Sequence, residues 1–516
     1  MSNSSESPTY EGSQQRNFLG HPVGLSICFL TEMWERFSYY GMRTILVLYL
    51  VKYHLYSTGE ASLIYAAYAG LVYMMPIIGG YMADRYLGSR KAVTFGAILL
   101  VIGHGLMGFH GPASILDGEQ VIRDDFYISL FFLSLALIIT GVGFLKANIS
   151  TIVGSLYGKN DPRRDGGFSI FYMGINLGSL ISTGLVGYVG ETYGWNYGFS
   201  LAGIGMLLGL FVFLWGQKFL GGRAEPANPQ LLKEKSAIGL NKEYTIYLFG
   251  LGLVLASWLL VQYQQLVGQL LGFSGFIMIA VIILYAFKNC SKIERERIMV
   301  ACFLIAVQSV FWALFEQQAA SLTLLADQQF NLNVLGINLL ASQVQLLNPL
   351  IIVIFAPIMG WLWVALSNKN MEPTTPSKFA IAMLLIGFGY VFFAWGLTLD
   401  DSASKSFLWL AIIYFSLTIA ELCLSPVGLS MVTKLSVSKI VGMMMGTWFL
   451  FSALGNYVAG WISSLTGSSK TGAGSGMLDI VATIDVYTTI GYSSIGVGLF
   501  IFALTPWLKK GMHGVH

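Results

Sequence analysis

The sequence contains few charged residues. They make up 11% of its 516 residues, whereas hydrophobic residues make up 55%. A soluble domain usually carries about 25% charged residues, so this shortage excludes an ordinary soluble globular protein. Long apolar runs take the place of the charges and predict an all-α polytopic membrane protein. The net charge of +3 is spread over short loops and indicates no nucleic-acid partner.

Cysteine pairs and metal-binding patterns are also absent from the sequence. The four cysteines, Cys28, Cys290, Cys302 and Cys423, have no paired spacing, so we expect free thiols. No CxxC or HExxH pattern occurs, and no GxxxxGK[ST] loop that could bind a nucleotide. The sequence therefore predicts no metal and no cofactor, and it argues against direct use of ATP.

Fourteen apolar segments are long enough to cross a bilayer, and they group as six, two and six. The predicted spans are 22–52, 61–83, 91–110, 126–154, 167–190 and 195–217, then 244–263 and 266–287, and finally 298–325, 336–366, 377–399, 406–433, 440–466 and 486–508. Residues 218–243, between the first six and the pair, are rich in charge, Pro and Gly, which is typical of a linker.

The basic residues indicate the orientation. Most of the 29 lie in the loops on one side, and the opposite loops hold only Lys52, Arg123, Lys405 and Lys470. An excess of Lys and Arg marks the cytoplasmic side, so both termini are predicted to be cytoplasmic. The chain then divides into a cytoplasmic tail (1–20), a six-helix bundle (21–218), a cytoplasmic linker (219–242), an inserted transmembrane hairpin (243–290), a second six-helix bundle (291–510) and a cytoplasmic tail (511–516).

Seven charged residues lie inside the predicted spans: Glu32, Glu35, Arg36, Arg43, Lys146, Glu316 and Glu421. A charge at the centre of a spanning helix costs about 2.5–3.5 kcal/mol even on the most lenient scale. We therefore expect these side chains to face a shared polar cavity rather than lipid.

The first span concentrates these charges on one helical face. At 100° per residue, Glu32, Glu35, Arg36, Tyr40 and Arg43 lie within a stripe of about 140°. One arginine can then serve two carboxylates, and two neighbouring carboxylates hold a proton readily. An ion network that only packs helices together is the alternative interpretation.

Other spans carry polar or aromatic pairs with i,i+4 spacing: Tyr172 with Asn176, Trp312 with Glu316, and Glu421 with Ser425. Arg43 and Lys146 thus provide positive charge in the first six spans, and Glu421 provides negative charge in the last six. A cavity with these opposite poles suits a zwitterion. Asn348-Pro349 is predicted to break a helix.

Three long motifs resemble those of one family. "GGYMADRYLGSRK" (79–91) is similar to the loop motif of the major facilitator superfamily and, extended through Gly103, to the first signature of the proton-dependent oligopeptide transporters. "FSIFYMGINLGSL" (168–180) is similar to the second signature of that family. "TEMWERFSYYGMR" (31–43) contains its ExxER motif as Glu32, Glu35 and Arg36. The resemblance covers essentially the whole chain.

The resemblance implies the major facilitator fold, in which two six-helix bundles surround a central cavity and alternate between inward-open and outward-open states. It implies symport of di- and tripeptides with protons as the coupling ion, in the inner membrane of a bacterium, by a monomeric functional unit. The inserted hairpin resembles that of prokaryotic members and is expected to be peripheral.

The resemblance also implies roles for residues. The implied peptide site consists of Tyr40, Arg43, Tyr73, Lys146, Tyr172, Asn176, Trp312, Phe315, Glu421 and Ser425. Glu32, Glu35, Arg36 and Glu316 would couple protons to transport, and Asp84 and Arg85 would form a conformational latch.

The sequence departs from the family pattern in three places. Ala147 follows Lys146 where many members have proline, so the helix bend there is expected to be weaker. Ala66 replaces a histidine of the animal members, so proton coupling must depend on carboxylates and Lys146. The second half contains only a weak match to the loop motif, "GWLWVALSNKN" (360–370).

Other functions remain open at this point. Another proton-linked carrier of the same superfamily, for a drug, nitrate or an amino acid, is the main alternative, although it would not need charged poles on opposite halves. An enzyme is disfavoured because no Ser/His/Asp grouping, metal cluster or cofactor loop occurs. A receptor is disfavoured because the sequence contains no soluble sensing domain.

Overall fold

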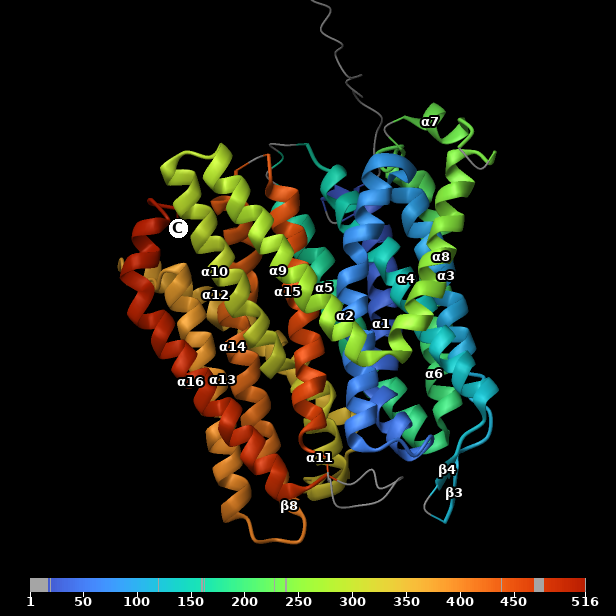
Figure 1. The fold of residues 1–516 in the computed structure, drawn as a ribbon, viewed down its shortest axis with the longest axis vertical. Coiled ribbons are helices and arrows are strands. Elements are labelled where there is room, and N and C mark those ends of the chain that lie inside the picture. Colours follow the sequence, from blue (N-terminus) through green and yellow to red (C-terminus); the bar gives the residue numbers. More distant parts are fainter. Residues whose placement is uncertain are drawn as a thin grey trace, which may run out of the picture.

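The computed structural model describes residues 17–515 except 19, 119, 159–160, 162, 227, 237–238, 438 and 468–477. Most of the predicted tail 1–20 thus lies outside the described residues. Within the described part, each of the 14 predicted spans corresponds to a long helix, and the few strands are short (Figure 1). The predicted all-α membrane fold is confirmed.

The first bundle contains six long helices. They are α1 (Gly24–Lys52), α2 (Thr58–Met82), α3 (Gly88–Met107), α4 (Asp125–Ser155), α5 (Arg164–Tyr193) and α6 (Trp195–Gly216). Local signals start several of them: Ser57 and Glu60 form a capping box at α2, and the Asp124 side chain accepts hydrogen bonds from two backbone N–H groups at the start of α4. The π-helical turn η1 (Ala83–Leu87) joins α2 directly to α3.

The linker is anchored to the first bundle. It contains the 3-10 turn η2 (Gln217–Leu220) and the short helix α7 (Pro229–Lys233). The guanidinium of Arg90 forms an ion pair with Glu225, and the Arg90 N–H donates to the Ala224 carbonyl at 2.9 Å. Gly88 has φ +73°, and a Cβ atom there would lie 2.4 Å from the Pro226 nitrogen, so this close approach requires glycine.

The inserted hairpin consists of α8 (Lys242–Gln262) and α9 (Gln264–Asn289). Helix α8 packs on α4 and α2 of the first bundle, whereas α9 also packs on helices of the second half. Phe273 and Phe276 of α9 point their rings away from the protein and are exposed. The hairpin therefore covers one side of the junction between the bundles and leaves an apolar outer face for lipid.

The second half contains six long helices and several short elements. These elements are α10 (Lys292–Phe315), η3 (Glu316–Ala319), α11 (Ser321–Gln329), η4 (Ser342–Leu346), α12 (Leu347–Ser367), α13 (Thr375–Leu399), α14 (Phe407–Leu435), α15 (Val441–Ser464) and α16 (Ile480–Gly511). The short strands are β1 (Asn17–Phe18), β2 (His21–Pro22), β3 (Ile115–Asp117), β4 (Gln120–Ile122), β5 (Phe330–Asn331), β6 (Asn333–Val334), β7 (Ile337–Asn338) and β8 (Lys405–Ser406). β5 pairs with β8 in parallel, and the other pairs are antiparallel hairpins.

Two predicted spans are interrupted. The span 298–325 stops being α-helical after Phe315, because the Gln317 side chain donates to the Ala313 and Ala459 carbonyls, at 3.0 and 2.8 Å, and Ser321 donates to Gln317. The span 336–366 becomes α-helical only at Leu347. Pro349 lies in the first turn of α12, where its missing N–H costs no helical hydrogen bond. It marks the start of this helix rather than a break within it.

Length and composition support a membrane location for most of these helices. Eleven segments of the described chain are long and apolar enough to cross a membrane, and one of them contains both α2 and α3. Helix α1 is not among them, because it carries five charged residues, four of them well inside the helix. Large apolar side chains are exposed on outer helices such as α6, α8, α9, α12 and α16, as expected for surfaces that face lipid.

The helices run between two ends of the molecule. One end holds α7 and the C-terminus, and the other holds α11, β3, β4 and β8 (Figure 1). We refer to these as the α7 end and the α11 end. The first and second bundles lie side by side, and α2 packs on α15 across the junction.

Candidate functional site between the two bundles

A polar cavity of about 110 Å³ lies between the bundles, and both contribute to its wall. The residues that line it are Tyr40, Arg43, Tyr73, Ser179, Thr183, Trp312, Phe315, Glu316, Gln318, Gln345, Asn348, Pro349 and Glu421. Six of the ten residues predicted for the peptide site are among them, together with Glu316, which was predicted to couple protons. Segments more than 300 residues apart in the chain thus meet at one place.

Arg43 connects the two halves at this cavity. Its Nη2 atom forms an ion pair with Glu316 of η3, and its Nε donates to the Tyr65 hydroxyl at 2.7 Å. Arg43 Nη1 has no hydrogen bond to any described residue and remains available to an anion in the cavity. The ring of Tyr40 lies 5.8 Å from the guanidinium and limits its movement.

Lys146 is set back from the cavity wall. Its ammonium group lies 4.3 Å from the centre of the Tyr73 ring, and Tyr73 itself lines the cavity. Lys146 also interacts electrostatically with Glu32 and Glu35. It is therefore placed between the cavity and the acidic cluster of α1.

Glu421 provides the negative pole on the opposite bundle. Asn348 of α12 donates its side-chain N–H to Glu421 Oε2 at 3.1 Å, and it donates to Thr418 Oγ1 at the same distance. This contact fixes the carboxylate against the wall. Arg43 and Glu421 thus line one cavity from opposite halves of the molecule.

Aromatic rings form part of the wall. Trp312 and Phe315 meet edge to face with their centroids 5.3 Å apart. The Trp312 Nε1 atom is buried and has no hydrogen-bond partner among the described residues. An unpaired buried donor of this kind is costly, so it indicates a place for a ligand acceptor.

Besides Lys146, three residues predicted for the site do not reach the cavity wall. Tyr172 is 53% exposed, and the Asn176 side chain donates to the Tyr172 carbonyl at 3.0 Å, within its own helix. Ser425 lies one turn beyond Glu421 and is half-buried. All three are displaced from the wall toward the α7 end.

Sequence reasoning missed six residues of the wall: Ser179, Thr183, Gln318, Gln345, Asn348 and Pro349. Ser179 and Thr183 continue the helical face of Tyr172 and Asn176 at i,i+3 and i,i+4 spacing, so this pattern could have found them. Gln345 and Asn348 had no such signal, because their position depends on where α12 begins.

The acidic cluster of α1 is buried beside the cavity. Arg36 forms an ion pair with Glu35, and its Nε lies 3.1 Å from Glu32 Oε1. Glu35 is 1% exposed. One oxygen of each carboxylate and Arg36 Nη2 have no hydrogen-bond partner within the described part of the chain. The cluster is compact, but its hydrogen bonding is incomplete.

The two bundles are joined at the α11 end. Lys52 forms an ion pair with Asp327 at 2.5 Å, and the hydroxyls of Ser62 and Ser463 are 2.8 Å apart. A Cβ atom at Gly460 would lie only 2.4 Å from a side-chain atom of α2, so α2 and α15 are in close contact here. These contacts close the cavity on this side.

At the α7 end the bundles are less closely joined: Tyr172 and Met173 of α5 are 53% and 56% exposed, and no ion pair among the described residues links the bundles there. Asp84 and Arg85 are exposed, and neither forms an ion pair with the second bundle within the described residues. Asp161 lies in the loop before α5 at the same end of the molecule. It pairs with Arg163 of its own loop at 2.8 Å rather than with the second bundle, and this hydrogen bonding lowers the pKa of Asp161 to about 2. The predicted latch is therefore not engaged in this conformation.

The geometry defines a class of protein. Two six-helix bundles with a polar cavity between them, closed at one end and open at the other, form a membrane carrier of the major facilitator fold rather than an enzyme. The family model described as "POT family" matches residues 90–478. The chain therefore belongs to the POT family.

Known proteins similar to this chain support the assignment. The uncharacterized transporter YclF of Bacillus subtilis is 38% identical over 508 residues and covers 97% of each chain. The peptide transporter YePEPT of Yersinia enterocolitica is 35% identical over 478 residues, which is 87% of this chain and 88% of that protein. A crystal structure of a variant of the peptide transporter POT in complex with alafosfalin has a TM-score of 0.81 and 34% identity, over 97% of this chain and 98% of that one.

Proposed function

We propose that this chain carries di- and tripeptides together with protons into the cell by alternating access. The observation that carries the proposal is the placement of Arg43 and Glu421 on opposite bundles around one cavity. A short peptide has an amine at one end and a carboxylate at the other, and both must be compensated in a low-dielectric site. Similar proteins named as peptide transporters support this substrate class. The alternative function, a proton-linked carrier of a drug, nitrate or an amino acid, has no such support.

The peptide carboxylate would bind Arg43, with Lys146 adding positive charge from behind Tyr73. The Nη1 atom of Arg43 is free to donate, while its other nitrogens are occupied by Tyr65 and Glu316. The peptide amine would bind Glu421, and Trp312 Nε1 would donate to a backbone carbonyl of the peptide. Tyr172, Asn176 and Ser425 would meet the substrate nearer the open end.

Proton coupling would work through the ion pair between Arg43 and Glu316, which joins the bundles on the closed side of the cavity. When Glu316 takes up a proton, the charge attraction is lost and this end can open. Glu32 and Glu35 share Arg36 and interact with Lys146, so protonation of these carboxylates would release positive charge for the carboxylate of the peptide. No cofactor other than the proton is needed.

The conformation described here would be open to the cytoplasm. The α7 end holds the basic loops, including Arg85, Arg90 and Lys91, which mark the cytoplasmic side of a membrane protein. Asp84 and Arg85 would engage the second bundle only when this end closes. We place the protein in the inner membrane of a bacterium with both termini cytoplasmic, and we expect a monomer to be sufficient for transport, without nucleic acid.

Uptake of a labelled dipeptide into proteoliposomes tests the proposal. We expect an inward proton gradient to stimulate uptake, unlabelled di- and tripeptides to compete, and free amino acids, nitrate and cationic drugs not to compete. The proposal would be contradicted if uptake did not depend on the proton gradient. It would also be contradicted if free amino acids, nitrate or cationic drugs competed and peptides did not.

Glu421→Gln is expected to weaken binding of peptides with a free amine by about tenfold to a hundredfold, because a charge-assisted contact is lost. N-acetylated peptides should bind poorly to the parent protein and be unaffected by the change. Competition against a labelled dipeptide measures the binding of the free peptides and of the N-acetylated peptides. Glu296→Gln, which removes an exposed carboxylate of α10 paired with His513, is the matched control. Equal competition by acetylated and free peptides would remove Glu421 from the amine site.

Arg43→Lys is expected to weaken binding of peptides with a free carboxylate by about tenfold, because a fork of donors is replaced by a single ammonium group that cannot serve Tyr65, Glu316 and substrate together. Peptide amides should lose less. The ratio of inhibition constants for a dipeptide and its amide measures the effect in one preparation. An unchanged ratio in folded protein would show that Arg43 does not contact the carboxylate.

A further inference from the structure

The closed end of the molecule contains a contact between the bundles that the transport mechanism above does not use. The turn η4 (Ser342–Leu346) leads directly into α12, and together they form one apolar helical segment, 342–367. η4 belongs to the second half of the chain, but it packs on α5 of the first bundle. The beginning of this segment is therefore part of the junction at the α11 end.

The carboxylate of Glu191, near the end of α5, supplies a hydrogen-bond acceptor to this segment. The backbone N–H of Ser342 donates to Glu191 Oε1 at 3.0 Å. The first N–H groups of a helical segment have no acceptor within the segment itself, and Ala341, which precedes η4, has no side-chain acceptor to offer. Glu191 thus does across the junction what a capping residue does within one helix.

Two glutamine side chains add weaker hydrogen bonds across the same junction. Gln343 donates to the Gly184 carbonyl of α5 at 3.3 Å, and Gln345 donates to the Thr44 carbonyl of α1 at 3.5 Å. These bonds are longer than the bond to Glu191, and neither involves a charged group. A hydrogen bond to a carboxylate is roughly twice as strong as one between neutral groups, so Glu191 provides the main polar attachment of η4 to the first bundle.

The side chain of Ser342 opposes this attachment. Its Oγ atom is fully buried and has no hydrogen-bond partner among the residues that the structure describes. A Cβ atom at Gly187 of α5 would lie only 2.4 Å from it, so α5 covers the hydroxyl closely. A buried unpaired hydroxyl is unfavourable, and water would restore its hydrogen bonds when the bundles separate. Ser342 therefore stabilises the closed end through its backbone and destabilises it through its side chain.

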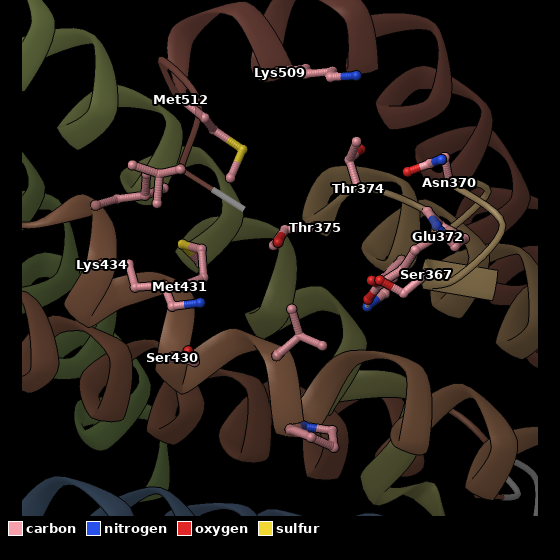
Figure 2. A pocket seen from close by; sticks show the side chains of 16 residues that line it. Ser367, Asn370, Glu372, Thr374, Thr375, Ser430, Met431, Lys434, Lys509 and Met512 are labelled. Carbon is pink, nitrogen blue, oxygen red and sulfur yellow. Dashed lines mark hydrogen bonds and ion pairs between the residues drawn. The ribbon is translucent and has the colours of Figure 1, made fainter. Parts of the chain in front are cut away.

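The same segment reaches the transport cavity. Gln345 and Asn348 line that cavity, and Asn348 donates to Glu421, the residue proposed to bind the peptide amine. At the other end of the helix, Ser367 lines a separate cavity of about 710 Å³, whose described wall residues all belong to the second half of the chain (Figure 2). The hydrogen bonds that link the segment to the first bundle thus lie at its beginning, beside the transport cavity.

We propose that Glu191 is a positioning residue for transport: its carboxylate holds the beginning of the η4–α12 segment against α5 and so determines how often the α11 end opens. Opening breaks the bond between Glu191 and the Ser342 N–H, and it hydrates the Ser342 hydroxyl. The two residues therefore act on the same equilibrium in opposite directions. The inference rests on the proposed alternation of the bundles, but on neither the peptide nor the proton.

The accessibility of a cysteine at the junction tests the proposal in the full-length protein in detergent. Ser62 is fully buried at the α11 end, so the rate at which a maleimide alkylates the Ser62→Cys variant reports the open fraction. Mass spectrometry of the peptide that contains residue 62 measures this rate. In this background Glu191→Gln is expected to raise the rate about fivefold, because a neutral amide accepts more weakly than a carboxylate. Ser342→Ala is expected to lower the rate at least about threefold, because the unpaired hydroxyl is removed.

Two matched controls make the same chemical changes away from the junction. Asp124→Asn removes a carboxylate that caps α4 within the first bundle. Ser257→Ala removes a buried hydroxyl of α8 that also has no partner within the described chain. Neither should change the alkylation rate by more than about twofold. Ser463→Cys, on the opposite side of the junction, provides a second reporter in case Ser62→Cys impairs folding.

Thermal unfolding shows that each variant compared is folded. Unchanged rates in Glu191→Gln and Ser342→Ala, or changes of the same sign in both, would overturn the proposal. Absence of alkylation in every variant at both reporter positions would overturn it as well, because the α11 end would then not open. Failure of peptide uptake would contradict the proposed substrate and leave this result standing, since alkylation requires neither a peptide nor a proton gradient.

Discussion

Glu316→Gln is expected to abolish peptide uptake driven by a proton gradient, a fall of at least about tenfold, while exchange of labelled for unlabelled peptide continues. Glutamine keeps an oxygen for Arg43 but cannot change its charge. The contact between the bundles would then no longer respond to a proton, although the bundles could still alternate with peptide bound. Net proton movement is needed for concentrative uptake but not for exchange.

The measurement compares two assays in one proteoliposome preparation: uptake with an inward proton gradient, and exchange with equal pH on both sides. Glu35→Gln should give the same result, as should Glu32→Gln if the two carboxylates titrate as one unit. Removing one partner of a buried pair can cost about 3–5 kcal/mol of stability, so thermal unfolding of each variant must be recorded. If folded variants lose both activities, these acids hold the structure or the peptide rather than the proton.

A disulfide between positions 62 and 463 is expected to stop all transport, including exchange. The hydroxyls of Ser62 and Ser463 are 2.8 Å apart across the junction of the bundles at the α11 end, so cysteines placed there are within bonding reach. A covalent bond at this point would hold that end closed, and alternation requires it to open. The oxidised Ser62→Cys/Ser463→Cys variant should lose at least about tenfold in both assays and recover on reduction.

The single variants Ser62→Cys and Ser463→Cys serve as controls, because each adds one thiol to the four that the protein already has. Neither should respond to oxidation. Full exchange activity in an oxidised double variant with a demonstrated disulfide would show that this end does not open during transport. The contrast with Glu316→Gln, which spares exchange, separates movement of the bundles from proton coupling.

Much of the fold followed from the sequence, because a membrane imposes a simple rule: every backbone polar group in the lipid must be bonded within its own helix. Apolar length alone therefore predicted the 14 long helices. The interruption at Glu316 could not be predicted in this way, since it depends on Gln317 donating to the carbonyl of Ala459 on another helix. The residue at which α12 begins could not be predicted from the sequence either.

The residues of the site could be predicted where placing them in a membrane span costs much free energy. Charges inside spans pointed to Arg43, Glu316 and Glu421, and all three line the cavity. Neutral residues gave a weaker signal because serine, threonine and glutamine are common within helices for many reasons. Ser179 and Gln345 were missed on that account. Tyr172 was included because its motif matched, although it lies toward the open end, away from the cavity wall.

The sequence by itself determined that this chain is a helical membrane carrier with charges buried in its spans, because the cost of placing charge in lipid leaves few other arrangements. Only the tertiary structure decided which charges pair between the two bundles. Arg36 lies one turn from Glu32 and binds it as the spacing predicted, whereas Arg43 binds Glu316 at a distance of 273 residues along the chain. That second pairing depends on how two separate bundles meet, and helix periodicity contains no information about it.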